Sequence, residues 1–258
     1  MPANDLALLL AAARSAGKVA LKYFHDGAES WEKPDNQGLV TEADLAVDAH
    51  LLARLRDARP DYGWLSEETQ DDRARLDAPR TFVIDPIDGT RAFAERYRSW
   101  AISVAVVEAG RPVAAVIHLP ARRLTYTAAL GQGAVLNAEV LLHVTGRTEL
   151  PGASLLASRP TMEPEHWPRG LPPVRREFRT SLAYRMALVA EGRFDAMATF
   201  RDTWDWDIAA GSLIAAEAGA TVTDAEGAAL SFNSTLRHSP GLICATPAIH
   251  EALLSHRR

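Results

Sequence analysis

The segment FVIDPIDGTRAF, residues 82–93, constrains the fold of this chain more than any other part of the sequence. Three apolar residues typical of a buried strand run directly into Asp85, and Asp88 follows three positions later. The proline between these carboxylates has no backbone donor, so we expect the strand not simply to continue past it. Gly89 and Thr90 then have the character of a short helix start. The segment therefore predicts two carboxylates on a turn from a strand to a helix.

This turn offers ligands of two kinds. The carboxylates of Asp85 and Asp88 suit a hard cation, and the carbonyl of Ile87 would add a further oxygen ligand. The backbone amides of Gly89 and Thr90, free at a helix start, suit a phosphate. The sequence thus favours a site that holds both a divalent cation and a phosphate group.

Two further acidic positions fit the same centre. Glu67 and Glu68 end a short strand in the sequence WLSEET, and Asp207 opens a helix in WDIAAG. Each has a more ordinary explanation when taken alone, as a solvated surface pair or as a helix cap. Because they occur together with the DPIDGT run, a shared site is the better explanation, and we expect all three segments to converge in one cleft. A set of oxygen ligands selects Mg²⁺ or Mn²⁺ over zinc.

The composition excludes several classes of protein. The chain has 258 residues, with 28 Lys and Arg against 33 Asp and Glu, and this net charge of −5 disfavours a nucleic-acid groove binder. Its single cysteine, Cys244, cannot form an intrachain disulfide and suits a reducing compartment. The apolar stretch over residues 6–13 is too short for a membrane span and lacks the basic flank of a secretion signal. We expect a soluble, cytoplasmic protein that binds neither a nucleic-acid polymer nor a membrane.

The rest of the chain alternates between helical and strand-like patterns, with Asn4 or Asp5 as the cap of the first helix. Residues 25–37 are typical of a loop or hairpin, and the cluster of Gly146, Pro151 and Gly152 marks a break. We therefore expect an α+β or α/β fold of two sub-domains, residues 1–146 and 147–258, with a cleft between them. The expected helices are 6–24, 41–59, 181–192, 208–218 and 247–256, and the expected strands are 63–66, 81–84, 101–107, 113–118, 124–128, 155–158, 196–200, 221–223 and 242–245.

Four segments together resemble one family. GLVTEADLAVD (38–48), WLSEET (64–69), DPIDGTRAF (85–93) and WDIAAG (206–211) are similar, in this order, to the motifs of the inositol monophosphatase family. The resemblance covers nearly the whole chain. It implies a Mg²⁺-dependent, lithium-sensitive phosphomonoesterase with a layered αβαβα sandwich of two sub-domains, the sugar-phosphatase fold, and a metal site between them.

The resemblance also implies roles for individual residues. Glu67, Asp85, the carbonyl of Ile87 and Asp88 match the ligands of a first Mg²⁺, and Asp207 with Asp85 and Asp88 matches those of a second. A third, weaker ion would involve Glu67. We therefore expect two to three Mg²⁺ ions, for which Mn²⁺ could substitute.

The remaining catalytic groups follow from the same resemblance. The amides of Gly89 and Thr90 match the family's phosphate cradle. The hydroxyl of Thr90, paired with Asp44, matches the pair that activates the attacking water. The expected reaction is hydrolysis by water, without a phosphoenzyme.

The substrate is a separate question, because the family acts on inositol monophosphates, 3'(2'),5'-bisphosphate nucleotides, histidinol phosphate and fructose bisphosphate. The inositol-type pattern places a Glu about seven residues before the WD aspartate, where this chain has Phe200. The runs FRDTWDWD (200–207) and LVAEGRFDA (188–196) are closer to the 3'(2'),5'-bisphosphate nucleotidase branch. They favour adenosine 3',5'-bisphosphate as substrate, hydrolysed to AMP and phosphate. An inositol-1-phosphate or histidinol-phosphate phosphatase, and a scaffold that retains the fold, are the alternatives.

Several residues of the second half are candidates for substrate contact. Ser181 and Asp207 are expected near the substrate, and Arg185 and Arg201 could bind a second phosphate, although each arginine alone is more often a surface group. Trp204 and Trp206 could stack on a base, although packing is the commoner role. The expected partner is a small phosphorylated metabolite, and the protein could be a monomer or a homodimer.

Overall fold

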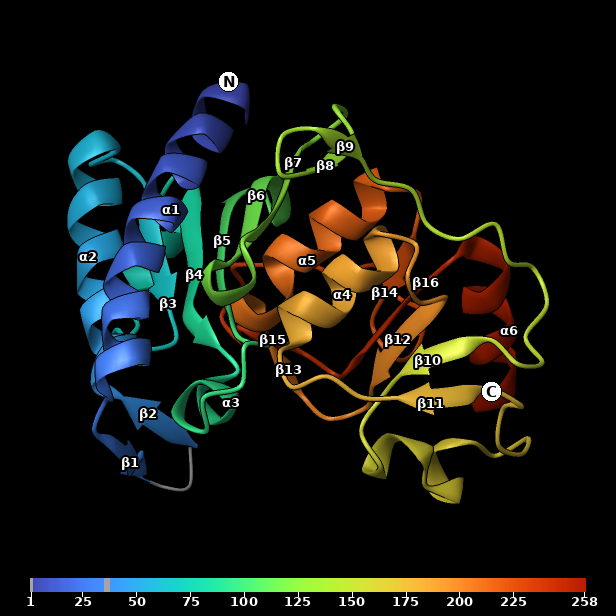
Figure 1. The fold of residues 1–258 in the computed structure, drawn as a ribbon. Helices are drawn as coiled ribbons and strands as arrows, with labels where there is room; N and C mark the ends of the chain where they lie inside the picture. The colour runs from blue at the N-terminus through green and yellow to red at the C-terminus, as the bar shows by residue number, and fades with distance from the viewer. Residues whose placement is uncertain (1, 35–37) are drawn as a thin grey trace.

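The protein is an αβαβα sandwich in the computed structural model, which describes residues 2–34 and 38–258 (Figure 1). The helices are α1 (Pro2–Asp26), α2 (Glu42–Ala58), α3 (Thr90–Ala94), α4 (Leu182–Ala190), α5 (Asp205–Glu217) and α6 (Pro247–Arg257). The strands are β1 (Ser30–Glu32), β2 (Leu39–Thr41), β3 (Gly63–Ser66), β4 (Thr81–Asp88), β5 (Ala101–Glu108), β6 (Arg111–Leu119), β7 (Leu124–Ala129), β8 (Ala134–Leu136), β9 (Val140–Leu141), β10 (Ser154–Leu156), β11 (Arg175–Glu177), β12 (Ala196–Thr199), β13 (Thr203–Trp204), β14 (Thr221–Thr223), β15 (His238–Ser239) and β16 (Leu242–Ala245).

Two sheets carry the sandwich. The larger has the order β3-β4-β5-β6-β7-β8-β9 and is antiparallel except for the parallel pair β3-β4. The smaller has the order β11-β10-β12-β16-β14. Helices α1 and α2 cover the outer face of the larger sheet, α4 and α5 fill the space between the sheets, and α6 covers the outer face of the smaller one (Figure 1). The predicted layered fold class is confirmed.

The layers explain the patterns of the helices. Helix α2 begins at Thr41, whose side chain accepts from the amides of Ala43 and Asp44 while the Asp44 carboxylate accepts from the Thr41 amide. Helix α5 is buried around almost its whole circumference because it lies between two sheets, and its middle turns are accordingly apolar on every side. The predicted starts of α2 and α4 agree with the structure to within one residue.

Three local predictions about element boundaries were wrong. The first helix begins before Asp5, which is no cap: its buried carboxylate binds Arg59, Tyr62 and Arg80. Strand β4 does not stop at Pro86 but runs to Asp88, because a register shift against β5 accommodates the residue that has no donor. Helix α5 begins three residues before the predicted Ile208.

Other predictions divide between confirmed and open. The hairpin predicted within residues 25–37 exists as the pair β1-β2, with residues 35–37 outside the described part of the chain. The larger sheet uses strands between residues 63 and 141, and the smaller one uses strands between 154 and 245. Because α5 packs against both sheets, the division into 1–146 and 147–258 stays a prediction. In the described residues, no helix is long and apolar enough to cross a membrane.

Candidate metal centre and active site

The end of β4 brings two carboxylates to the same place. Residues three positions apart point to opposite faces of a regular strand, so the register shift between Asp85 and Asp88 is what lets both side chains reach one centre. Gly89 follows with φ 97°, a left-handed conformation that a residue with a side chain adopts only under strain. The chain enters α3 at Thr90, so only Gly89 separates strand from helix. Both carboxylates therefore lie in β4, and the prediction that they lie on a turn after the strand was wrong.

Asp207 completes this centre from α5. One carboxylate oxygen each of Asp85, Asp88 and Asp207 lie within 4.8 Å of one another. Burial, and then the neighbouring carboxylates, raise the pKa of Asp85 and of Asp207 well above the usual range, and burial raises the pKa of Asp88 to about 6. The buried Oδ1 of Asp85 has no hydrogen-bond partner among the described residues. Three crowded carboxylates with an unpaired buried oxygen fit a hard divalent cation.

Glu67 lies at the edge of this centre. Its charge contributes to the raised pKa of Asp85, so the two carboxylates are close, but its own carboxylate binds Lys33 Nζ at 2.9 Å. The same ammonium binds Glu68 at 2.7 Å, and burial raises the pKa of Glu68 to about 7. The contacts of Lys33 had no sequence signal. The role of Glu67 as a metal ligand stays a prediction.

Thr90 and Asp44 are hydrogen-bonded. Thr90 Oγ1 lies 3.2 Å from Asp44 Oδ1 and 3.2 Å from the carbonyl oxygen of Ile87, so its single proton has two acceptors. The other oxygen of Asp44 is already occupied by the backbone and hydroxyl of Thr41. Burial raises the pKa of Asp44 to about 6, against the lowering effect of its hydrogen bonds. This arrangement leaves Asp44 Oδ1 as an acceptor at the centre.

Helix α4 supports Asp88 through its first turn. The Ser181 hydroxyl donates to Asp88 Oδ2 at 2.6 Å, and the amides of Leu182 and Ala183 donate at 3.2 and 2.6 Å. These bonds place the positive end of the helix dipole on the carboxylate. Since Ser181 is fully buried and its proton is used for Asp88, its predicted contact with substrate stays a prediction. The sequence marked Ser181 as a helix start but contained no signal for its partner.

Arg185 lies in the next turn of α4 and faces a pocket of about 520 Å³ that Arg201 also lines. The residue is only 6% exposed, its Nε donates to the Arg179 carbonyl, and its guanidinium lies 4.7 Å from the ring centre of Phe178. Among the described residues, it has no carboxylate within ion-pair distance. Burial lowers the pKa of Arg185 to about 10. A buried arginine without an acidic partner, open to a pocket, is suited to bind an anion.

A larger pocket of about 900 Å³ lies on the side of Glu67 and Glu68. Trp204 and Trp206 both line it and stack face to face, with ring centres 5.0 Å apart and planes inclined by 10°. Trp206 is buried, whereas Trp204 is 41% exposed, so the two predicted stacking residues differ. Of these two residues, Trp204 exposes the larger surface to the pocket.

Phe200 lines the smaller pocket rather than the larger one, and its ring is packed against neighbouring side chains. It contacts Trp167 and is covered by the guanidinium of Arg257 at 4.0 Å. Arg257 also binds Glu226 at 2.7 Å, so the last residues of α6 are held against the part of the protein that contains the smaller sheet.

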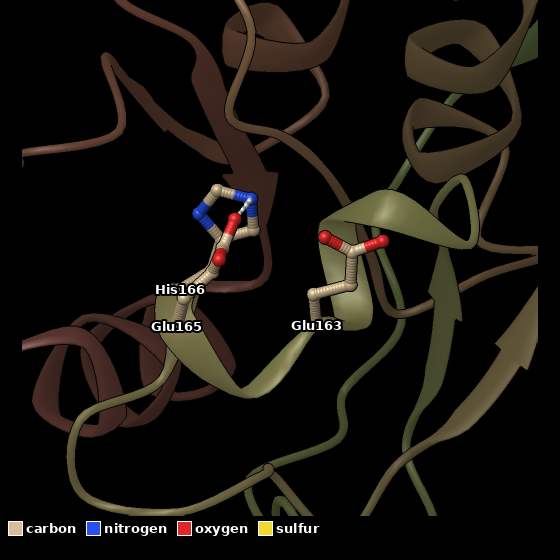
Figure 2. A group of neighbouring side chains, drawn as sticks. All are labelled: Glu163, Glu165 and His166. Carbon is tan, nitrogen blue, oxygen red and sulfur yellow. Dashed lines mark ion pairs between the residues drawn. The ribbon is translucent and has the colours of Figure 1, made fainter.

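Figure 2 shows a second group of side chains that could hold a metal ion, separate from the cluster of Asp85, Asp88 and Asp207. Glu163, Glu165 and His166 are close enough to share an ion, and His166 lies 3.9 Å from Glu165. Both glutamates are exposed, so water can solvate them without a cation. We assign no metal site to this group.

Comparisons with known proteins agree with this geometry. The model of the inositol monophosphatase family matches residues 2–258. The chain belongs to this family. It is 33% identical to the Nus factor SuhB of Haemophilus influenzae over 98% of this chain and 95% of that protein. It is 32% identical to the 3'(2'),5'-bisphosphate nucleotidase CysQ of Salmonella typhimurium over 85% of this chain and 90% of that protein. The structure of an IMPase of Thermotoga maritima has a TM-score of 0.83 at 27% identity, over 99% of this chain and 96% of that one.

Membership of the inositol monophosphatase family makes the chain a metal-dependent phosphomonoesterase. Family membership does not test the scaffold alternative, because a scaffold that retains the fold would match the same family model. The acidic cluster of Asp85, Asp88 and Asp207 agrees with a metal-dependent family, while the identity and number of the ions belong to the proposal below.

The crowded carboxylates of this family member predict a pH-dependent stability in the absence of metal. A carboxyl whose pKa is raised on folding binds its proton more tightly in the folded state, so its contribution to stability is present at low pH and is lost as pH rises through the raised value. In EDTA, the unfolding free energy of the wild type relative to Asp207→Asn should therefore fall between pH 5 and pH 8. Urea denaturation at several pH values measures this difference.

The comparison with Asp207→Asn removes contributions that the two proteins share. His118, for example, acts in the opposite direction because burial lowers its pKa to about 4. A difference between wild type and variant that does not change with pH would contradict the crowding of Asp207 with Asp85 and Asp88.

Proposed function

We propose that this member of the inositol monophosphatase family is a 3'(2'),5'-bisphosphate nucleotidase, with adenosine 3',5'-bisphosphate as its substrate and AMP and phosphate as its products. The observation that carries this proposal is Arg185, a buried arginine that lines a pocket and has no ion-pair partner among the described residues. The charges of Asp88 and Asp207 reach its guanidinium, so it lies near the carboxylate cluster. The similarity to CysQ supports the same substrate class.

The charges around Arg185 favour a second phosphate on the substrate. Asp88 and Asp207 are the acidic groups that favour the charged form of Arg185, while Arg201 opposes it, so two arginines and the metal centre share one neighbourhood. Arginine binds phosphate oxygens through two parallel hydrogen bonds, and burial strengthens such bonds. A substrate with a second phosphate would give Arg185 and Arg201 the anionic partner that the described chain does not provide.

The exposed ring of Trp204 favours a substrate that contains a nucleotide base. Trp204 is held in place by Trp206 and also lies 5.7 Å from the guanidinium of Arg237, so the ring is positioned without being buried. Stacking on an aromatic side chain contributes about 1–3 kcal/mol per base. We propose that the adenine occupies the larger pocket against Trp204, with the reacting phosphate between the two pockets.

The catalytic residues act around that phosphate. Asp85, Asp88, Asp207, the Ile87 carbonyl and Glu67 would hold two to three Mg²⁺ ions, with Mn²⁺ as a substitute and lithium as an inhibitor. When bound there, two hard cations supply the positive charge that an in-line displacement at phosphorus needs on both its attacking and its leaving oxygen.

The remaining steps belong to protein groups. The amides of Gly89 and Thr90 would orient the phosphate oxygens at the start of α3. The Thr90 hydroxyl would orient the attacking water and pass a proton to Asp44, whose pKa of about 6 leaves it ionised and able to accept that proton at neutral pH. The alkoxide oxygen left on the nucleotide would be protonated by solvent.

Hydrolysis of inositol 1-phosphate is the second candidate. The likeness to the Thermotoga maritima IMPase extends over nearly the whole chain and favours it. Against it, Phe200 is packed under Arg257 and offers no acceptor for a ring hydroxyl. Under either candidate, we propose that the substrate is a small phosphorylated metabolite. We propose that the protein acts as a monomer or a homodimer, which sedimentation in solution would distinguish.

The variant Arg185→Met tests the substrate assignment. It keeps a long apolar side chain at this position but removes the guanidinium, and with it the contact over the Phe178 ring. We therefore expect kcat/KM for adenosine 3',5'-bisphosphate to fall by about 10- to 100-fold, the effect of one charge-assisted hydrogen-bonded group. Hydrolysis of glycerol 2-phosphate, which has no second phosphate, should change less than about threefold. Steady-state kinetics on both substrates measures the ratio.

The matched control is Arg169→Met, which removes an exposed arginine that lines neither pocket. It should leave both substrates unaffected. Equal losses on both substrates in Arg185→Met would contradict a role in binding a second phosphate.

A further inference from the structure

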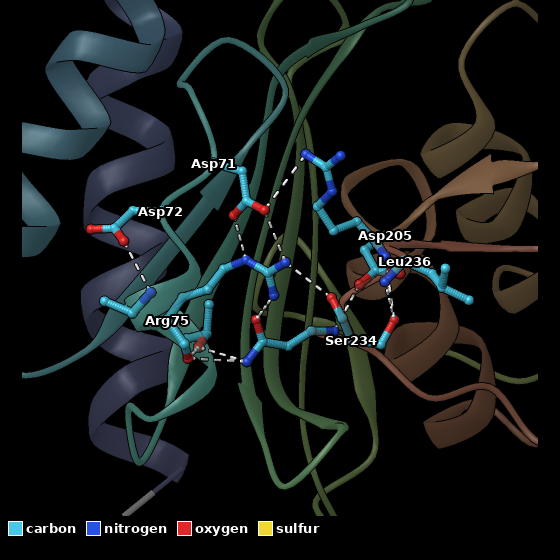
Figure 3. Close-up of polar contacts among 10 residues, drawn as sticks. Asp71, Asp72, Arg75, Asp205, Ser234 and Leu236 are labelled. Atoms are coloured by element: carbon cyan, nitrogen blue, oxygen red, sulfur yellow. Dashed lines mark hydrogen bonds and ion pairs between the residues drawn. The ribbon is translucent and has the colours of Figure 1, made fainter.

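A polar network joins two parts of the chain that are distant in sequence (Figure 3). On one side it contains Asp71 and Arg75, which follow the strand that ends in the Glu67 region, and on the other it contains the segment 233–237. Asp205, the first residue of α5, lies at its end. The network therefore connects the segment after Glu67 to the helix that carries Asp207.

Arg75 is its central member. The residue is only 2% exposed and uses all three of its guanidinium nitrogens: Nε donates to Asp71 at 2.6 Å, Nη1 to the side chain of Asn233 at 2.6 Å, and Nη2 to the carbonyl of Ser234 at 2.9 Å. The partners lie up to 159 positions apart in sequence. Figure 3 shows Arg75 extended between Asp71 and Ser234. A buried charge that donates hydrogen bonds from all three nitrogens fixes both segments relative to each other.

Asn233 connects Arg75 to the start of α5. It has φ 58°, its side chain also bonds Thr81, and its backbone amide donates to Asp205 Oδ2 at 2.7 Å. The amide of Asp205 in turn donates to the Arg237 carbonyl at 2.8 Å. Asp205 is fully buried, so it cannot exchange these partners for water. The first turn of α5 is thereby held at its backbone and at its side chain.

We propose that Arg75, acting through Asn233 and Asp205, is a positioning residue that fixes the start of α5 and so places the Asp207 carboxylate in the metal centre. Asp207 is two residues after Asp205 in the same helical turn, so a shift of this turn moves both. Groups that orient metal ligands contribute roughly 10- to 100-fold to metal affinity. The proposal rests on the metal centre proposed above.

A second arginine network provides the matched control. Arg80 binds Asp5 at 2.7 Å and Glu108 at 3.1 Å and contacts the Tyr62 hydroxyl. Arg80 precedes β4, at the opposite end of that strand from Asp85 and Asp88, and its side chain binds α1 rather than the 233–237 segment. Loss of Arg80 should lower stability in the manner of any paired arginine, without moving α5.

The test is Mn²⁺ binding, followed by titration calorimetry or by the electron paramagnetic resonance signal of free Mn²⁺, without substrate. Arg75→Met should bind Mn²⁺ at least about tenfold more weakly than the wild type, whereas Arg80→Met should stay within about twofold. Asn233→Gly retains the left-handed backbone and the amide that bonds Asp205 but removes the side chain that receives Arg75. It should weaken Mn²⁺ severalfold and serves as the deciding variant if Arg75→Met does not fold.

The outcomes are distinguishable. Mn²⁺ affinity equal to that of Arg80→Met in both network variants would overturn the positioning role, even if their thermal stability fell. Absence of Mn²⁺ binding in the wild type would instead overturn the metal centre itself. In folded variants that bind Mn²⁺ more weakly, saturating Mg²⁺ should restore kcat. The Mg²⁺ concentration that gives half of the maximal activity should rise by the same factor as the Mn²⁺ dissociation constant.

Discussion

Asp207→Asn is expected to reduce phosphate release by at least about a thousandfold at saturating substrate. The side chain is one of three carboxylates whose oxygens lie within 4.8 Å, and removing it takes away several kcal/mol of the charge stabilisation that a two-cation centre contributes to the transition state. An amide of the same shape retains the packing at the start of α5, so the loss is one of charge.

The fold of this variant should persist. Burial and crowding already disfavour the ionised form of Asp207 in the metal-free protein, so Asp207→Asn should be as stable as the wild type or more stable in EDTA at pH 8. The stabilisation that Mg²⁺ gives the wild type should be lost in the variant. Phosphate release and thermal unfolding with and without Mg²⁺ measure both effects, and activity within tenfold of the wild type would contradict the assignment.

Asp88→Asn is a less clean experiment, for a reason that only the structure supplies. Asp88 accepts hydrogen bonds from Ser181, Leu182 and Ala183 at the start of α4. An amide nitrogen facing those donors would lose at least one bond, so Asp88→Asn should lose stability as well as activity. A stability equal to that of Asp207→Asn would show that the α4 contacts contribute little.

Thr90→Ala is expected to lower kcat by about 10²- to 10⁴-fold, the contribution typical of a positioned proton-transfer group. The hydroxyl lies 3.2 Å from Asp44, and among the described residues this hydrogen bond links the Asp44 carboxylate to the DPIDGT segment. Thr90→Ser retains that hydroxyl and should restore most of the activity. Single-turnover kinetics at saturating Mg²⁺ measures the step.

Metal binding separates two roles for Thr90. The same hydroxyl is 3.2 Å from the Ile87 carbonyl, which we propose as a metal ligand. If Thr90 acts on the attacking water, Thr90→Ala should keep its Mn²⁺ affinity within a few-fold of the wild type. A large loss of affinity would assign Thr90 to the support of Ile87 instead.

The parts of this protein that follow from short-range rules were predictable from sequence. The capping pattern at Thr41 marked the start of α2, and the strand leading to Asp85 was evident from its apolar residues. The layered fold, and the pairing of Thr90 with Asp44, were inferred through the family resemblance, and the structure shows the layers and the hydrogen bond. The position of Asp207 beside Asp85 was likewise expected and is present.

The remaining features depend on contacts between residues far apart in sequence. A register shift against β5 lets β4 pass its proline, and no property of the β4 sequence alone encodes that partner. The bonds from α4 to Asp88 span 93–95 positions, and those from Arg75 to the 233–234 segment span 158 and 159. Periodicity reports which face of an element is buried, but not which polar groups meet there.

The most direct test of the proposed activity is phosphate release from adenosine 3',5'-bisphosphate, inositol 1-phosphate, histidinol phosphate and fructose 1,6-bisphosphate in about 5 mM Mg²⁺, the millimolar range that weakly bound Mg²⁺ requires. We expect the nucleotide to be preferred by about 100-fold or more in kcat/KM, equivalent to about 2.7 kcal/mol of transition-state discrimination. A preference for inositol 1-phosphate would contradict the roles given to Arg185 and Trp204, while leaving the family and its metal centre in place.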